Sequence, residues 1–375
     1  MGEVGDRRKI APHVFQQPRE TKSVWLPFYC FLGDNGFFTI ICDRYLCRRL
    51  EAESTTVIPA VQQPSITDST YTAPTTLPTV SLIIITMNSA AFVGKVLHSI
   101  RTQCYPVDRL RTIVIDHASR DGTVKLIRRD YPWVTLLAEK SNHGFAGGNN
   151  IGMRAYPADY YALVNPDAVI APDWLPILVA TLEADPTIGV VGCKIYYGDG
   201  SGNSTLLQHA GAMFRDNALT YHFGDKEPDN GQYDQQRDVD YVMGAAFVAR
   251  GGLTKRLGYL PEEYFPAYFE ESDFCTQVRK AGKRVVYVPT AVAWHDEAHS
   301  GSRSFTAKFL RRYHKHRYLY ALRNYTTAAE RQKFTIAERD WRHKYANTIP
   351  ARTLLFYSKW VNWRWLIRRP WLFRV

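Results

Sequence analysis

Three carboxylates fall within the short segment YFEESDFC, which runs from Tyr268 to Cys275. They belong to Glu270, Glu271 and Asp273, and aromatic residues lie beside them. A carboxylate placed next to a hydroxyl group can act as a general base, and neighbouring carboxylates raise one another's pKa toward neutrality. A solvated acidic turn would contain the same residues. The segment therefore leaves a choice between a catalytic site and a surface turn.

The elements that would position these carboxylates follow from the hydrophobic pattern. The segment TVSLIIIT contains a continuous apolar run, which is typical of a strand buried on both faces. Further strands are expected at residues 110–116, 133–138, 160–165, 188–195 and 283–289, and helices at residues 91–102, 122–130 and 174–184. This alternation predicts an α/β fold with a doubly wound, mostly parallel sheet.

In such a sheet, ligands bind at the carboxyl ends of the strands. The first strand ends in Thr86-Met87-Asn88, and the second ends in Asp116, a candidate to accept hydrogen bonds from a base or ribose. The third strand leads into SNHGFAGGNN, a glycine-rich loop before a helix expected to start near Asn149. Backbone amides in such a loop can approach an anion closely. Turns and glycine-rich loops are also common in proteins where they bind no ligand. The ligand-binding interpretation therefore depends on the location of these residues at the strand ends.

A divalent metal site is expected at the same edge. Asp167 follows the fourth strand in the motif Asn165-Pro166-Asp167, and His295 follows the last strand. Carboxylates bind Mg²⁺ or Mn²⁺ while phosphate oxygens and water complete the ion's coordination. Taken singly, Asp167 could belong to a plain turn and His295 could be structural. The two together favour a metal site.

Composition places the chain among globular proteins, with 375 residues, 45% hydrophobic and 22% charged. The net charge of +11 is uneven, because residues 301–375 contain 18 Lys and Arg against 3 Asp and Glu, a net of +15, which leaves −4 for residues 1–300. The 6 cysteines form no CxxC pair, as in reduced cytosolic proteins. We find no signal peptide or membrane-spanning pattern and expect a cytoplasmic protein.

Four regions are expected along the chain. Residues 1–53 form an N-terminal extension of unknown role, and residues 54–79 have the Ser, Thr and Pro content of a linker. The α/β domain covers residues 80–302, and residues 303–375 form a basic, aromatic, helical C-terminal region.

The chain from Val80 to about Ser302 resembles the family 2 inverting glycosyltransferases with a GT-A fold. The subgroup that looks most similar transfers rhamnose, galactofuranose or related sugars. The resemblance rests on seven segments in order: VSLIIITMNS, IVIDHASRDGT, SNHGFAGGNNIGM, YYALVNPDAVIAPDWL, DYVMGAAFVAR, YFEESDFCTQVRKAGKRVVYVP and AWH. It covers neither residues 1–79 nor the C-terminal region.

The resemblance implies a role for each matching residue. Thr86, Asn88 and Asp116 would line the nucleotide pocket, and Asn142, Gly144 and Asn150 would border the nucleotide-sugar. Asn165 and Asp167 stand at the family's metal motif with His295 as a late ligand, and Gly244 and Ala245 would lie near the sugar and acceptor.

The family's acidic motif reads Glu-Asp-x-Asp, and its second acid is the implied general base. This chain has Glu-Glu-Ser-Asp, so Glu271 takes the base position with one extra methylene. Asp273 is the second candidate, and Glu270 is expected to support the base. A further departure is Gln277, where the family usually has Arg.

The implied function is inverting sugar transfer from a nucleoside-diphosphate sugar, either dTDP-rhamnose-like or UDP-linked. The acceptor would be a hydroxyl of a glycan or lipid-linked saccharide in cell-surface polysaccharide synthesis. The alternative is a catalytically silent relative that binds nucleotide-sugar or glycan as a scaffold.

The basic C-terminal region allows two interpretations. The segments FTAKFLRRYHKHRYLYALRNY and LLFYSKWVNWRWLIRRPWLFRV mix aromatic and cationic residues, which suits a helix lying on an anionic membrane. The protein would then be peripheral on the inner face of the plasma membrane. Equally, a helix could pack its aromatic side chains against the α/β domain. No RNA- or DNA-binding signature accompanies the charge, so nucleic acid is not favoured as a partner, and the oligomeric state stays open.

Overall fold

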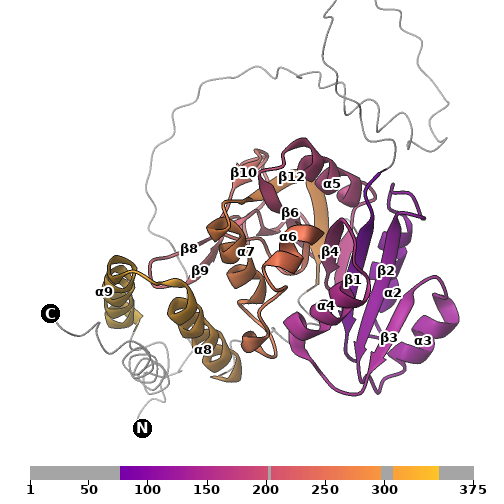
Figure 1. Cartoon of the computed structure of the whole chain (residues 1–375), viewed down its shortest axis with the longest axis horizontal. Coiled ribbons are helices and arrows are strands. Elements are labelled where there is room, and N and C mark those ends of the chain that lie inside the picture. The colour runs from indigo at the N-terminus through magenta and orange to yellow at the C-terminus, as the bar shows by residue number, and fades with distance from the viewer. Residues whose placement is uncertain (1–76, 202–203, 297–306, 346–375) are drawn as a thin grey trace, which may run out of the picture.

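The computed structural model describes residues 77–201, 204–296 and 307–345 (Figure 1). The predicted N-terminal extension, the linker up to residue 76 and the segment 346–375 lie outside these residues. The predictions made for those segments therefore remain predictions.

A single large sheet forms the centre of the molecule. Its strands run in the order β10-β12-β6-β11-β4-β1-β2-β3, with β5 beside β12 and β7 beside β6. Their bounds are β1 Val80–Thr86, β2 Leu110–His117, β3 Thr135–Glu139, β4 Tyr160–Val164, β5 Ala168–Ile170, β6 Ile188–Tyr197, β7 Leu207–His209, β10 Arg237–Asp238, β11 Ala246–Arg250 and β12 Arg284–His295. A separate hairpin consists of β8 Ala212–Phe214 and β9 Thr220–His222.

The helices lie on both sides of this sheet and at one end of it (Figure 1). Their bounds are α2 Val93–Arg101, α3 Thr123–Asp130, α4 Gly144–Ala155, α5 Trp174–Ala184, α6 Gly251–Arg256, the 3-10 turn η1 Glu262–Tyr264, α7 Glu270–Lys280, α8 Ala307–Asn324 and α9 Ala328–Tyr345. The pairs β1–β2, β1–β4, β2–β3 and β6–β12 are parallel, and β11 is antiparallel to both of its neighbours. The predicted α/β fold with a mostly parallel sheet is confirmed.

The continuous apolar strands are explained by two hydrophobic cores, one on each face of the sheet. Leu82 and Ile84 of β1 belong to a core shared with α2 and α5. Ile83, between them, belongs to the opposite core with α4 and α7. Because side chains alternate along a strand, both sets are buried only when helices cover both faces.

Helix α4 differs from the prediction, because it begins at Gly144 and not near Asn149. The glycines therefore lie within the helix. A Cβ at Gly148 would lie 2.7 Å from the His117 ring, and one at Gly152 would lie 3.1 Å from Ile83. Their missing side chains allow α4 to approach β1 and β2 closely.

The helical C-terminal region is confirmed for residues 307–345, where α8 and α9 form. Their aromatic side chains join a third cluster that includes Tyr264 and Phe269 from the α7 end of the domain, together with Tyr318, Tyr320 and Phe334. The packing interpretation therefore holds for this part of the region. Within the described ranges, no helix has the length and apolar character needed to cross a bilayer.

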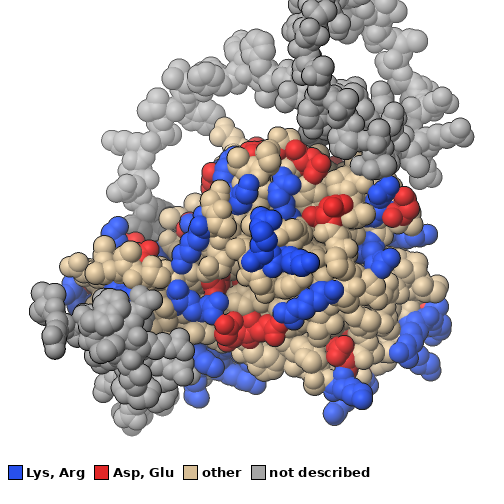
Figure 2. Space-filling view, viewed as in Figure 1, with Lys and Arg blue, Asp and Glu red and all other residues tan. Residues whose placement is uncertain are grey.

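Charged side chains are mixed on the face of the molecule seen in Figure 2. Lys and Arg are interspersed there with Asp and Glu and do not gather into one basic surface. This face therefore offers no continuous electrostatic track of the kind that nucleic-acid binding uses.

Candidate active site

The carboxyl ends of β1 and β2 are joined by a buried hydrogen-bond network. Thr86 and Asp116 are register partners, and Thr86 Oγ1 donates to Asp116 Oδ2 at 2.9 Å. Ser119 donates to the same carboxylate through its backbone N at 2.9 Å and its Oγ at 2.5 Å. Asp116 is 1% exposed. Its carboxylate therefore shapes the loop that follows β2, and little of it faces the solvent.

Asn88 connects the same two loops from the exposed side. Its backbone N donates to Ser119 Oγ at 2.8 Å, and its Oδ1 accepts a hydrogen bond from the backbone N of Arg120 at 2.9 Å. Asn142 lies at the next strand end, where its Nδ2 is 3.2 Å from Met87 Sδ. The structure thus brings the loops after β1, β2 and β3 together at one edge of the sheet.

Gly144 marks the point where this edge meets the segment before α7. Its backbone N donates to Asn142 Oδ1 at 2.7 Å, and its φ is 72°. A Cβ at this position would lie 2.8 Å from Pro266 O and 2.9 Å from a ring carbon of Phe265. Only glycine fits both the backbone conformation and the contact.

Asp167 and His295 meet in the interior near the ends of β4 and β12. Asp167 Oδ1 lies 3.2 Å from His295 Nε2, and both side chains are buried. His295 Nδ1 lies 3.0 Å from Gln208 Oε1. Because an amide oxygen can only accept, Nδ1 carries a proton, and in the neutral ring Nε2 then has a lone pair directed toward Asp167. Asn165 Nδ2 lies 3.3 Å from the same Nε2.

This donor set fits a divalent ion. Asp167 Oδ1 is buried without a hydrogen-bond partner, which is costly unless another group satisfies it. Adjacent ligands of an octahedral ion are about 3 Å apart when each is about 2.1 Å from the metal. Among the described residues, no group of three or more His, Cys, Asp or Glu side chains is placed to hold a metal. An ion here would take its other ligands from phosphate oxygens and water.

The first turn of α7 carries two neighbouring carboxyl groups, of which Glu270 is buried and Glu271 is half-buried. Glu270 is 1% exposed, and neither of its carboxylate oxygens has a hydrogen-bond partner. Burial, followed by the charge of Glu271, raises the pKa of Glu270 well above its ordinary value. Burial also raises the pKa of Glu271, from 4.5 to about 7. Burial therefore favours the neutral form of Glu270, and Glu271 is close to half ionised near pH 7.

Glu271 faces the backbone that leads to the metal motif. A Cβ at Gly244 would lie 3.5 Å from Cγ and Cδ of Glu271 and 3.3 Å from Phe145 Cζ. The next residue, Ala245, accepts a hydrogen bond from the backbone N of Asn165 at 2.8 Å. Glu271 and Asp167 are thus connected through the single short segment that contains Gly244 and Ala245, which the sequence had placed near the sugar and acceptor.

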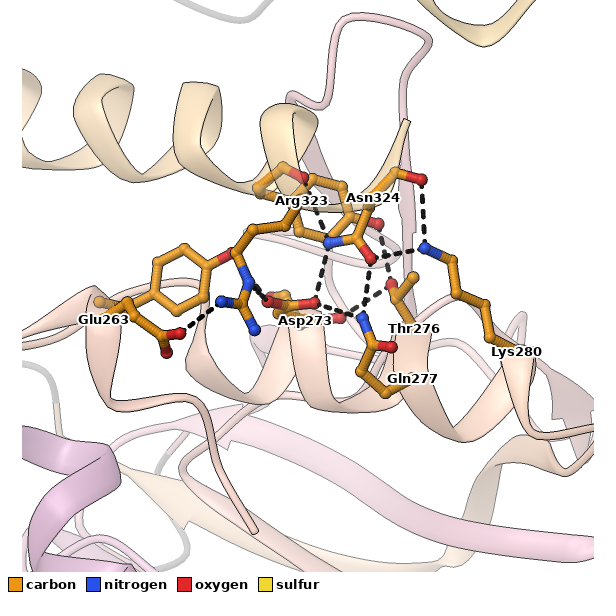
Figure 3. Close-up of polar contacts among 10 residues, drawn as sticks. Glu263, Asp273, Thr276, Gln277, Lys280, Arg323 and Asn324 are labelled. Carbon is orange, nitrogen blue, oxygen red and sulfur yellow. Dashed lines mark hydrogen bonds and ion pairs between the residues drawn. The ribbon is translucent and has the colours of Figure 1, made fainter. Parts of the chain in front are cut away.

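Asp273 has a different environment from that expected of a second base candidate. It is completely buried and accepts hydrogen bonds from four side chains (Figure 3). The donors are Tyr264 Oη at 2.9 Å, Gln277 Nε2 at 3.0 Å, Arg323 Nε at 2.7 Å and Asn324 Nδ2 at 2.8 Å. Both carboxylate oxygens are therefore occupied by the protein. Gln277, the departure from the family pattern, bridges Asp273 and Asn324.

Asn150 is also placed differently from the prediction. It is fully buried, and its Nδ2 donates to Leu260 O at 2.9 Å and to Glu262 Oε1 at 2.8 Å. Its Oδ1 accepts a hydrogen bond from the backbone N of Leu260 at 3.0 Å. These contacts hold α4 to the segment before η1, so this side chain does not border the open edge of the sheet.

Sequence reasoning missed the residues that support this site. Gln208 fixes the tautomer of His295, Ser119 bonds to Asp116, and Arg323 and Asn324 bond to Asp273. Ser119 lies in the segment IVIDHASRDGT, three residues after Asp116, and that spacing was a local signal for it. Gln208, Arg323 and Asn324 stand in no motif and act across long sequence separations, so no local pattern could have identified them.

Comparisons with known proteins identify the family that part of this chain matches. Residues 81–252 match the family model described as glycosyl transferase family 2. An uncharacterized protein of Sinorhizobium fredii is 29% identical over 225 residues, covering 56% of this chain and only 24% of that protein. An N-acetylglucosaminyl-diphospho-decaprenol L-rhamnosyltransferase of Mycobacterium tuberculosis is 29% identical over 229 residues, covering 56% of this chain and 73% of that protein.

Among solved structures, a mannosyltransferase of Pyrobaculum calidifontis in complex with GDP-Man and Mn²⁺ has a TM-score of 0.50 and 22% identity, covering 86% of this chain and 80% of that one. At this identity the likeness concerns the fold, which is the GT-A glycosyltransferase fold. The domain that contains residues 81–252 belongs to glycosyl transferase family 2.

Proposed function

We propose that the protein is a metal-dependent inverting glycosyltransferase. It would move a sugar from a nucleoside-diphosphate sugar to a hydroxyl group of a glycan or lipid-linked saccharide. The observation that carries this proposal is the short connection from Asp167 and His295 through Ala245 and Gly244 to Glu271. Two side chains that can bind a metal ion then lie on one side of the site, and a carboxylate with a pKa of about 7 lies on the other.

The donor would lie along the edge formed by the loops after β1, β2 and β3. Thr86, Asn88 and Asn142 would border its nucleotide, and Asp116 would hold Ser119 and the loop around it in place. Asp167 and His295 would bind Mg²⁺ or Mn²⁺. When bound, the ion stabilises the negative charge that develops on the departing nucleoside diphosphate.

Glu271 would be the general base. Its carboxylate removes the proton from the acceptor hydroxyl as the oxygen bonds to the anomeric carbon and the bond to the nucleoside diphosphate breaks on the opposite face. This single displacement inverts the anomeric configuration. Burial raises the pKa of Glu270, which opposes a second negative charge beside the base. Asp273 has no free acceptor position, so we assign it a positioning role.

The donor and acceptor are proposed from the relatives. The Mycobacterium tuberculosis relative is named as a rhamnosyltransferase acting on a diphospho-decaprenol substrate, which supports a dTDP-rhamnose-like donor, with UDP-sugars as the alternative. A lipid-linked acceptor would place the protein at the inner face of the plasma membrane, in cell-surface polysaccharide synthesis.

A donor screen tests the proposal. Purified protein is incubated with dTDP-, UDP- and GDP-sugars, with and without Mn²⁺ or Mg²⁺, and donor binding and nucleoside diphosphate release are measured. We expect metal-dependent release with one donor class, and its loss in Glu271→Gln with donor binding retained. Glu183→Gln, an exposed glutamate on α5, serves as the control. Donor binding without any turnover, under every condition, would instead support the catalytically silent alternative.

A further inference from the structure

Helix α8 (Ala307–Asn324) lies beyond residues 80–302, over which the sequence resembles the family, yet it contacts the helix that carries Glu271. We propose that α8 is a positioning element of the active site, which holds the first turn of α7 in place through Asp273 and through the backbone of residues 267–268. This inference rests on the proposed role of Glu271 as the base. The residues of α8 that would hold this turn in place are Arg323, Asn324 and His316.

One face of α8 makes all of these contacts. His316, Tyr320, Arg323 and Asn324 are spaced by four, three and one residues, which places them on the same side of a helix. Tyr320 Oη lies 2.8 Å from Thr276 Oγ1 of α7. Arg323 Nε and Asn324 Nδ2 reach Asp273 one turn earlier (Figure 3). The contacts therefore extend along α7 toward its N-terminus, where Glu271 lies.

His316 holds the turn that precedes α7. Its Nδ1 lies 3.0 Å from Ala267 O and 3.2 Å from Tyr268 O, so this nitrogen donates its proton to the two carbonyls. Tyr268 and Phe269 have φ values of 86° and 81°, a conformation that residues with a Cβ disfavour. Two such residues in succession need external support. The contacts from α8 supply that support directly before Glu270.

The cation that pairs directly with Asp273 comes from α8, and Lys280 of α7 also interacts with this carboxylate electrostatically. Asp273 is completely buried, and a buried carboxylate requires a cation or several hydrogen bonds. Arg323 provides the charge, and it also pairs with Glu263 of η1. Asp273 is two residues after Glu271, within the same turn of helix. A shift of Asp273 would therefore move Glu271 as well.

Helix α8 is itself fixed from its other side. Arg317 is completely buried and donates through Nη1 to Glu338 Oε2 of α9 and to Asn217 O, at 2.6 Å in both cases. Tyr318 Oη also donates to Glu338, at 2.5 Å. The face that contacts α7 is therefore backed by α9 and by the β8–β9 hairpin, which makes α8 a rigid support.

A purely structural role would have different consequences from a positioning role. The loops after β1, β2 and β3 are not contacted by Arg323 or Asn324, so the donor site stays intact when these residues change. If α8 positions Glu271, its loss lowers kcat and leaves the donor KM unchanged. The loosened turn also admits water to Glu271, whose pKa then falls toward 4.5. Glu270, Tyr241 and Cys275 interact with Glu271 electrostatically and are unchanged in this test.

The experiment compares Arg323→Met with Arg311→Met in the full chain. Arg311 is an exposed arginine of the same helix, so the control repeats the chemical change away from α7. We expect Arg323→Met to lower kcat about ten- to hundredfold, to leave the donor KM unchanged, and to move the acidic limb of the pH–rate profile from about 7 toward lower pH. Arg323→Lys, which keeps the charge beside Asp273, should recover part of the loss. Equal kcat and pH profiles in Arg323→Met and Arg311→Met would overturn the inference.

Amide hydrogen exchange provides a readout that needs no turnover. In Arg323→Met, exchange should rise in peptides covering residues 265–275 and stay unchanged in residues 80–164. Should Arg323→Met not fold, Tyr320→Phe removes only the hydroxyl that contacts Thr276 and should give a smaller rise in the same peptides. Unchanged exchange at residues 265–275 would overturn the inference. A wild-type protein that transfers no sugar, but shows these exchange changes in Arg323→Met, would overturn the proposed function and leave the positioning of α7 supported.

Discussion

Asp167 Oδ1 and His295 Nε2 lie 3.2 Å apart, although Asp167 follows β4 and His295 is the last residue of β12. Gln208, on β7, accepts the proton of His295 Nδ1 and so determines which nitrogen faces Asp167. Metal-binding histidines commonly depend on such a partner for their tautomer and orientation. Gln208 should therefore matter for metal binding even though it would not touch the ion.

Gln208→Leu is expected to weaken Mn²⁺ binding about 10- to 100-fold, and Asp167→Ala should abolish it. Binding is measured without substrate, by the electron paramagnetic resonance signal of free Mn²⁺. Gln235→Leu makes the same change at an exposed position and should bind Mn²⁺ as the wild type does. Equal affinities of Gln208→Leu and Gln235→Leu would contradict the assignment of Gln208.

The pKa of Glu271 predicts the pH dependence of transfer. Burial raises this pKa from 4.5 to about 7, and a general base acts only in its ionised form. The rate should therefore fall about tenfold per pH unit below the midpoint and level off above it. The pH–rate profile between pH 5 and 9 checks this expectation. A midpoint near 4.5, the ordinary value for a glutamate, would show that the base is solvated or is another residue.

The same pKa predicts how stability changes with pH. Because the folded-state pKa of Glu271 lies above its unfolded value, its contribution to the free energy of unfolding is full below about pH 4.5 and is lost as the pH rises through about 7. Glu271→Gln has no charge to gain, so its stability relative to wild type should increase over this range by roughly 1–3 kcal/mol. Urea unfolding of both proteins at pH 5 and pH 8 measures the difference. A difference that is the same at both pH values would contradict burial of Glu271.

The sequence predicted the frame of the fold well because the frame depends on local patterns. The continuous apolar run of β1 predicted a strand buried on both faces, and Leu82 and Ile84 indeed lie in one core while Ile83 lies in the other. The start of α4 was misplaced because glycines normally end helices, whereas Gly148 and Gly152 sit inside one to allow close packing on β1 and β2. Such a contact depends on tertiary structure and has no local signal.

The candidate site was predictable in part for the same reason. Glu271 and Asp167 could be proposed because each lies in a short motif that resembles one of the family's. The environment of Asp273 was not predictable, since its partners Arg323 and Asn324 come from a helix beyond the family match. Asn150 matched a motif but bonds to Leu260 and Glu262. A motif specifies where a residue lies on the chain, whereas its role also depends on what the rest of the fold places next to it.

Gly144→Ala should destabilise the protein more than Gly122→Ala. Both glycines have positive φ, 72° and 93° respectively, but only at Gly144 would a Cβ meet other atoms, at 2.8 Å from Pro266 O. The backbone strain of a non-glycine residue costs about 1–2 kcal/mol at either position, so the difference between the variants isolates the steric contact. Thermal unfolding should show the larger decrease in Tm for Gly144→Ala, together with weaker donor binding, because Asn142 bonds to the same backbone amide. Equal decreases in Tm would show that the segment around Pro266 yields without cost.

The ion pair between Arg317 and Glu338 should be one of the main contributions of the C-terminal helices to stability. Both side chains are buried, whereas the pair between Arg339 and Asp340 on α9 is exposed. Removing one partner of a buried pair leaves an uncompensated charge and costs about 3–5 kcal/mol, whereas an exposed pair contributes about 0–1 kcal/mol. Urea unfolding should therefore show a large loss for Arg317→Met and almost none for Arg339→Met.

The double variant Arg317→Met/Glu338→Leu tests whether the stability lost in Arg317→Met is caused by the buried, unpaired charge of Glu338. Both charges are then absent, and two apolar side chains fill the space between α8, α9 and the β8–β9 hairpin. Replacing a buried ion pair in this way is often neutral, so most of the loss should be recovered. A double variant as unstable as Arg317→Met would mean that the hydrogen bonds from Arg317 to Asn217 O and from Tyr318 to Glu338 hold the helices together. In that case it is the geometry of the pair, more than its charge, that keeps α8 against α7.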